Sequence, residues 1–299
     1  MYTIIPSYLS GYEPVSPVRT DVVRDHAEQY LPLTDEKDAA QVLLPEAAIT
    51  FRRKYSDEPA RMENAPAKDR LDLILDSRTT ADLLLQNRGV AFRQNLILMM
   101  SYTGDFDPMI ATDSRYAYDE LDWGYTEQPF RQVQAIVQLQ GGWADKQKDL
   151  LSLLSLLSSL SPDAALASAL SGAHDRFAEM DTGAFSDARN AFDAVTDARA
   201  HLLENLMVYE IHRHYTAFAA QDTILPAVQF AAVTFAAVRS LLYSRFVEKG
   251  SFSDEDFARL VSGWSRAFEE DEKAFSALLS HFRDDPLFSR DRLVRMLWR

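Results

Sequence analysis

Apolar residues recur at the spacing of an α-helix along most of this chain. The first run, over about residues 67–89, places Leu71, Ile74 and Leu75 on one side of a helix. A second helix is expected over about 90–102. No strand-like alternation of useful length follows anywhere in the sequence. The pattern therefore predicts an all-α fold, organised as a multi-helix bundle.

The first 66 residues do not share this periodicity, because prolines recur through them and leave room only for short helices. We expect residues 1–66 to form an irregular N-terminal segment that packs on a helical body. Residues 67–299 are expected to form that body as one continuous domain.

The helical period breaks over Thr103–Pro129, which predicts one long acidic-aromatic loop. A lysine ammonium is attracted to carboxylates and to aromatic faces, and this segment offers both. The alternative is a surface loop whose aromatic rings are tucked against the helices. The substrate-binding candidates are Tyr116, Tyr118, Asp119, Glu120, Asp122, Trp123 and Tyr125.

The second half of the chain returns to helical spacing. A leucine-serine helix is expected over Leu150–Leu160, deeply packed and with a narrow stripe formed by Ser152, Ser155 and Ser159. Ser161-Pro162 is expected to cap the next helix. A long helix is predicted over Ser186–Ala217.

An apolar helix follows over Thr223–Glu248, and we expect it at the centre of the bundle. Its apolar run is shorter than the ~20 residues that a membrane span needs. Gly250 is expected to stop it, and Ser253 with Asp256 resembles a capping box for the helix after it. Asp285-Pro286 should end the next helix, and a short basic helix is expected to dock on the bundle or to bind a partner.

Composition narrows the possible functions. The net charge of −14 disfavours nucleic acid and favours cationic partners such as lysine-rich segments. The absence of cysteine excludes disulfides, thiolate zinc sites and a cysteine-ligated iron–sulfur cluster. The N-terminal sequence has no basic leader, so a cytoplasmic location is expected.

Titratable residues crowd into one predicted helix of the second half. They are His201, Glu204, Glu210, His212 and His214. One helix does not supply the three or four ligands of a metal site, so we expect no metal here and favour ion pairs on a solvated face.

Four short blocks, in order, resemble the flagellin lysine-N-methylase family. They are "MYTIIPSYLSGY", "VLLPEAAI", "LLLQNRGVAFRQNLILM" and a C-terminal block that ends in "SRAFE". The resemblance implies that the chain transfers methyl groups from S-adenosylmethionine to lysines of flagellin. The candidates taken from the C-terminal block are Glu204, Asn205, Tyr209 and Arg239. Asn205 is expected to bridge helices or to hold a ligand.

The chain departs from the family pattern at its cysteines, since Leu44 stands where the family carries a cysteine before the proline. It also has no glycine-rich turn of a nucleotide-binding fold, so S-adenosylmethionine would need a helical pocket. Two interpretations therefore remain open: a protein-lysine methyltransferase, or a non-catalytic all-helical protein-binding module. A third is an unrelated helical interaction protein whose likeness to the family is accidental.

Overall fold

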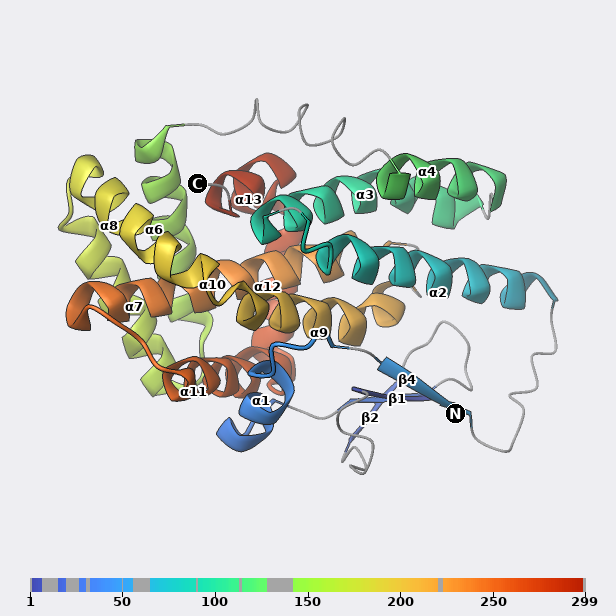
Figure 1. Ribbon diagram of the computed structural model, residues 1–299, viewed down its shortest axis with the longest axis horizontal. Coiled ribbons are helices and arrows are strands. Elements are labelled where there is room, and N and C mark those ends of the chain that lie inside the picture. Colours follow the sequence, from blue (N-terminus) through green and yellow to red (C-terminus); the bar gives the residue numbers. More distant parts are fainter. Residues whose placement is uncertain are drawn as a thin grey trace. The chain divides into compact units, whose positions relative to one another are not determined.

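The computed structural model confirms the all-α fold (Figure 1). It describes residues 2–6, 16–19, 27–30, 33–49, 51–55, 65–89, 91–112, 115–127, 142–219 and 223–297. The described chain forms two compact units, each assembled from three separate stretches. The first unit holds 1–32, 47–138 and 204–231, and the second unit holds 33–46, 139–203 and 232–299. A boundary at residue 66 remains a prediction.

Short strands occur in the N-terminal segment, where the sequence analysis predicted irregular structure. β1 (Tyr2–Pro6) pairs antiparallel with β4 (Phe51–Tyr55). β2 (Ser16–Arg19) pairs antiparallel with β3 (Ala27–Tyr30). Each sheet has only two strands, and such a pair is marginal in water unless other elements pack on it.

Three helices of the first unit pack side by side (Figure 1). They are α2 (Ala65–Leu85), α3 (Phe92–Thr112) and α4 (Arg115–Glu127). The long loop predicted over 103–129 is therefore wrong where the structure describes it. Helix α3 continues through Gly104 and Pro108, and Tyr102, Phe106 and Ile110 are fully buried along one of its faces. Burial on that face outweighs the hydrogen bond that Pro108 removes.

Helix α4 forms because its buried residues also have helical spacing. Tyr118 and Tyr125 are seven residues apart and are 4% and 2% exposed. Two turns of helix bring them to one side, where their rings contact Phe106 and Tyr102 of α3. The aromatic residues of this segment therefore stabilise a helix pair.

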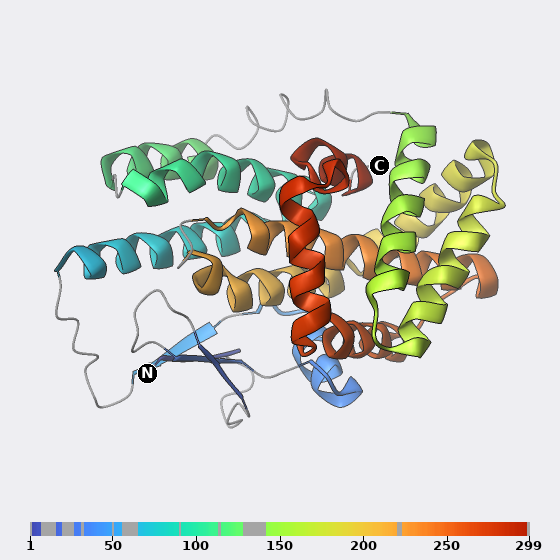
Figure 2. The same ribbon diagram turned by 180° about the vertical axis from the view of Figure 1, so that it is seen from behind.

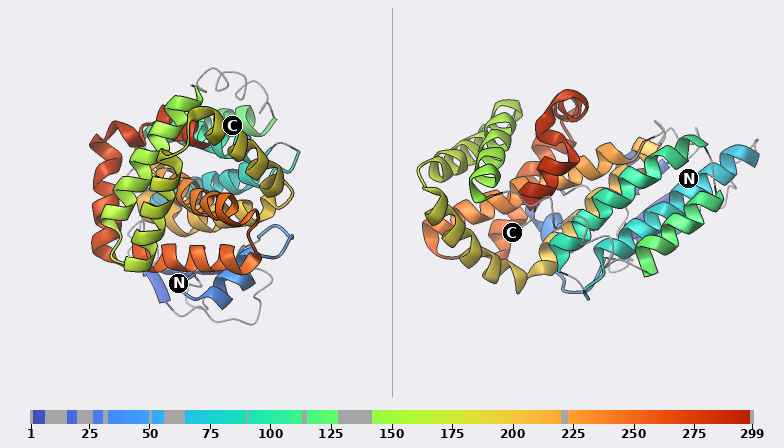
Figure 3. Two further views of the ribbon diagram at one scale, coloured as in Figure 1. Left: turned by 90° about the vertical axis from the view of Figure 1, so that its left-hand side faces the viewer. Right: turned by 90° about the horizontal axis from the view of Figure 1, so that it is seen from above.

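In the second unit, α6 (Trp143–Leu160) and α7 (Ala164–Ala178) stand side by side in every view (Figures 2 and 3). Leu153, Leu154 and Leu157 of α6 are fully buried, whereas its serine stripe is exposed, so this helix is less deeply packed than expected. Ser161 ends α6, and Asp163 caps α7, two residues after the predicted cap.

The helix predicted over 186–217 is divided in two. α8 (Thr182–Asp197) ends before Ala198, and α9 (Ala200–Ala219) begins after Arg199. Arg199 donates to the Phe252 carbonyl at 3.3 Å and pairs with Asp254, and its guanidinium lies 4.8 Å from the Phe252 ring centroid. These contacts join residues distant in sequence. They fix Arg199 between the two helices, where the helical period is interrupted.

Helix α10 (Leu225–Lys249) has the length and composition of a membrane span. However, 89% of its most apolar 18-residue stretch is buried, as in the core helix of a soluble protein. The prediction of a buried apolar helix is confirmed. Asp107 of α3 accepts from the Ile224 N–H at 2.7 Å at its start. Gly250 ends it with φ of 76°, a conformation that a side chain disfavours.

The C-terminal helices show two of the predicted boundaries. The capping box of Ser253 and Asp256 begins α11 (Asp254–Trp264), and a π-helical turn, η3 (Ser265–Glu269), follows it. α12 (Glu272–Asp284) ends before Asp285, which caps the short 3-10 turn η4 (Pro286–Phe288).

The last helix, α13 (Arg290–Leu297), docks on α6. Leu293 and Leu297 are buried, and Arg295 donates to Asp149 at 3.2 Å. The sequence predicts that Trp298 docks beside these two leucines, but it lies outside the described residues.

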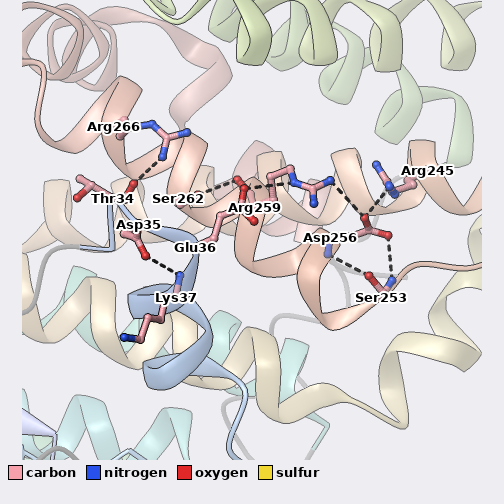
Figure 4. Close-up of polar contacts among 10 residues, drawn as sticks. All are labelled: Thr34, Asp35, Glu36, Lys37, Arg245, Ser253, Asp256, Arg259, Ser262 and Arg266. Carbon is pink, nitrogen blue, oxygen red and sulfur yellow. Dashed lines mark hydrogen bonds and ion pairs between the residues drawn. The ribbon is translucent and has the colours of Figure 1, made fainter.

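Helix α1 (Glu36–Leu43) packs against α11 within the second unit (Figure 4). Its apolar face buries Ala39, Val42 and Leu43 completely. At the surface, Arg259 donates to Glu36 at 3.3 Å and Arg266 donates to the Thr34 carbonyl at 2.5 Å. The apolar face carries most of the stability, because an exposed ion pair contributes less than about 1 kcal/mol.

Candidate functional site

Polar bridges join α2 and the chain just after it to α9 in the first unit. Arg88 binds both oxygens of Glu204 at 2.9–3.2 Å. His212 Nδ1 lies 2.8 Å from an Asp82 oxygen, and the Tyr215 hydroxyl donates to Ser77 at 2.9 Å. Positions fall along α2 as they rise along α9, so the two helices run antiparallel. We call these three pairs the α2–α9 bridges.

The central bridge is a histidine–carboxylate pair near the edge of the core. The side chain of His212 is 9% exposed and that of Asp82 is 18% exposed. A carboxylate that accepts from Nδ1 fixes the imidazole tautomer and leaves Nε2 as the basic nitrogen of the neutral ring. The pair therefore holds the imidazole in one orientation, with Nε2 buried inside the polar region.

Three buried phenols lie beside this pair, and we call Tyr102, Tyr118 and Tyr215 the tyrosine cluster. Thr80 of α2 donates to Asp122, so its oxygen accepts from the Tyr118 hydroxyl at 3.1 Å. Burial raises the pKa of all three phenols, and Asp122 also raises those of Tyr102 and Tyr118. The region thus combines hydroxyls, carboxylates and an imidazole at the meeting of α2, α3, α4 and α9.

Alkaline pH is expected to destabilise both units as the unfolded chain ionises, because each unit contains a buried phenol with a raised pKa. Burial raises the pKa of Tyr118 and of Tyr243 to about 12, from 10.0. Above pH 10 the unfolded state loses these protons first, so stability falls until the folded phenols also titrate near pH 12. We expect a fall of up to about 1.4 kcal/mol per pH unit for each phenol. Urea unfolding across pH 9–11.5, with tyrosinate absorbance, measures it, and unchanged stability would contradict it.

The residues predicted to bind substrate divide into buried and exposed groups within α4. Tyr118 and Tyr125 are buried, and Tyr125 donates to Asp105 at 2.6 Å. Asp122 is half-buried beside Thr80, whereas Asp119 and Glu120 are exposed. The side chains of Tyr116 and Trp123 lie outside those that the structure describes. A role of these seven residues in substrate binding stays a prediction.

Three of the family-block candidates lie on α9 in the first unit. Glu204 is 4% exposed and pairs with Arg88, while Asn205 and Tyr209 are 0% and 1% exposed. Arg213 donates to the Tyr209 hydroxyl at 3.4 Å. The Glu204 pair is one of the α2–α9 bridges, so this part of the block contributes to the packing of two helices.

The fourth candidate, Arg239, is in the second unit, on α10. It is 1% exposed and pairs with Asp193 of α8, which is 2% exposed. Arg189, one turn before Asp193, lies 3.5 Å from the same carboxylate, and its guanidinium lies 5.3 Å from the Tyr243 ring centroid. Two buried guanidiniums therefore share one carboxylate, an arrangement that fixes α8 against α10.

The second unit also contains an open groove at the junction of α6, α7 and α8, with a volume of about 440 Å³. Its described lining is Ala144, Gln147, Lys148, Leu151, Ser152, Ser155, His174 and Thr182. The serine stripe can be recognised in the sequence, but the groove cannot, because the sequence does not show which helices face each other.

Sequence reasoning also missed Ser77, Asp82, Tyr102 and Tyr215, which complete the polar region of the first unit. Their partners are up to 138 positions away in the chain. The sequence held one indication of this region. Ser77 and Thr80 fall on the apolar side of a predicted helix, where a buried polar residue needs a hydrogen-bond partner.

A family model, the FliB lysine N-methylase C-terminal domain, matches residues 78–296. The matched region contains Asp82, Glu204, His212 and Tyr215. Searches of the curated proteins and of the solved structures found no match.

Proposed function

This chain belongs to the flagellin lysine N-methylase family, and on that premise we propose that it methylates lysine side chains of flagellin or of another lysine-rich exported protein. The observation that supports this most is the family match, which covers the tyrosine cluster and two of the three α2–α9 bridges, those of Asp82 and Arg88. The net charge of −14 favours a cationic substrate. Such a reaction would take place in the cytoplasm, before the substrate is exported.

The polar region of the first unit suits a lysine substrate chemically. An ammonium group is attracted to carboxylates and phenol rings, and Asp122 brings a carboxylate to the half-buried edge of that region. The ammonium must lose a proton before its nitrogen can attack a methyl group. We propose His212, oriented by Asp82, as the group that accepts this proton.

S-adenosylmethionine would supply the methyl group in this family. The groove of the second unit has a suitable volume, since ligand pockets measure about 300–1,000 Å³. Its described lining nevertheless has no Phe, Tyr or Trp ring to stack on adenine and no carboxylate for a ribose diol or a sulfonium. The groove therefore does not fit this cofactor, and we assign it no part in methyl transfer.

The proposal predicts that the purified chain binds S-adenosylmethionine and methylates flagellin. Calorimetric titration should give saturable binding on the order of micromolar. Mass spectrometry of flagellin incubated with the chain and S-adenosylmethionine should then show added methyl groups on lysines. A reaction without the chain is the control.

A chain that binds flagellin but neither binds the cofactor nor adds methyl groups would contradict the catalytic proposal. That result would support the second candidate, a non-catalytic helical binding module. The absence of cysteine favours this alternative, because no cysteine-ligated cluster can form in this chain.

A further inference from the structure

The groove between α6, α7 and α8 differs in chemistry from the chain as a whole. The chain carries 45 acidic residues, yet none of the described lining residues is one of them. Lys148 comes from α6 and His174 from α7, so two groups that can carry positive charge face one groove from neighbouring helices. Hydroxyls of Ser152, Ser155 and Thr182 add hydrogen-bonding groups between them.

The groove is held by buried hydrogen bonds. Gln147 is 8% exposed, and its amide nitrogen donates to the carbonyls of Phe177 and Met180 at 2.8 and 2.9 Å. Its amide oxygen accepts from Thr182 at 3.4 Å. One side chain thus ties α6 to the end of α7 and to the start of α8. A site fixed in this way loses little conformational entropy when a ligand binds.

Several polar groups of the lining keep donors or acceptors that a ligand can use. His174 Nδ1 lies 3.0 Å from the Asp175 carboxylate, so Nε2 donates to a ligand when the ring carries both protons. Ser152 donates its proton to the Lys148 carbonyl at 3.0 Å, so its oxygen remains an acceptor. Lys148, His174 and Ser155 can donate, and several donors around one space suit a group with several acceptor oxygens.

We propose that this groove binds a small phosphorylated molecule through its phosphoryl group. Lys148 and His174 neutralise the negative charge of the phosphoryl group, Ser155 donates to one of its terminal oxygens, and Leu151 contacts the carbon skeleton of the ligand. The volume of about 440 Å³ accommodates a metabolite-sized ligand. The site lies in the second unit and does not depend on the proposed methylation, so either proposal can fail without the other.

Titration of the full chain with inorganic phosphate, followed by nuclear magnetic resonance of its histidine side chains, tests the site. We expect the His174 signals to shift saturably, with a dissociation constant of about 1 mM. Lys148→Gln should raise that constant about tenfold, because it removes a charge-assisted hydrogen bond. Lys273→Gln makes the same charge change at an exposed position of α12 and should leave the dissociation constant unchanged. Ser155→Asp should abolish binding through charge repulsion.

Acetate at the same ionic strength separates phosphate recognition from general anion binding. Equal shifts with acetate would overturn the phosphoryl assignment. Absence of any shift at about 20 mM phosphate, roughly twentyfold above the expected constant, would overturn the site. Thermal unfolding of each variant confirms that it is folded, and the exposed positions of Lys148 and Ser155 make that the expected result.

Discussion

Replacing Asp193 with alanine is expected to lower the free energy of unfolding by about 3–5 kcal/mol. The carboxylate is 2% exposed and is shared by Arg239 and Arg189, which are 1% and 6% exposed. Alanine removes the negative charge and leaves both guanidiniums in a region of low dielectric constant. That desolvation cost is larger than the net contribution of an intact buried pair.

Urea unfolding monitored by circular dichroism measures the effect. Asp197→Ala is the matched control, since it removes an exposed carboxylate one turn later on α8 and should change stability by less than about 1 kcal/mol. The double variant Asp193→Leu with Arg239→Met should be more stable than Asp193→Ala, because it removes Arg239 together with the carboxylate and leaves only one buried guanidinium, that of Arg189. A loss below about 1 kcal/mol for Asp193→Ala would show that the carboxylate does not hold the guanidiniums in solution.

Replacing His212 with glutamine is expected to lower the turnover of lysine methylation by about 10²–10⁴-fold. A lysine ammonium has a pKa near 10.4, so nearly all of the substrate is protonated at neutral pH. An imidazole oriented by a carboxylate 2.8 Å away can accept that proton, whereas an amide cannot. Glutamine retains a polar side chain of similar length, which limits the disturbance of the α2–α9 bridges.

Steady-state kinetics with flagellin and S-adenosylmethionine measure this effect. Asp82→Asn should lower kcat and leave KM for flagellin nearly unchanged, since Asp82 positions His212 and does not accept the proton itself. His201→Gln, on the same helix and only half-buried, is the control and should keep full activity. Full turnover in folded His212→Gln would exclude the base role, whereas an inactive wild-type chain would instead contradict the proposed methylation.

Features that depend on neighbouring residues could be predicted from the sequence. The capping box of Ser253 and Asp256 and the stop at Gly250 are determined within a few positions, and both are confirmed. The continuation of α3 through Pro108 could not be predicted, because it depends on the burial of Phe106 and Ile110 against other helices. The break at Ala198 and Arg199 likewise depends on partners more than fifty positions away.

The same distinction applies to the candidate site. Glu204 could be identified from a short block in the sequence, but its partner Arg88 is 116 positions away. The pairing of His212 with Asp82 spans 130 positions and leaves no local pattern. A polar residue on an apolar helix face predicts that a partner exists, but only the fold shows which residue it is.

The division of each unit into three separate stretches has a consequence for synthesis on the ribosome. Ser77, Asp82 and Arg88 emerge long before residues 204–215, which supply their partners in the α2–α9 bridges. Elongation at about 5–20 residues per second leaves α2 without α9 for roughly 6–25 s. The apolar face of α2 must be shielded during that interval, so we expect a chaperone to bind the nascent chain. For the same reason of connectivity, neither unit can be excised as one continuous fragment.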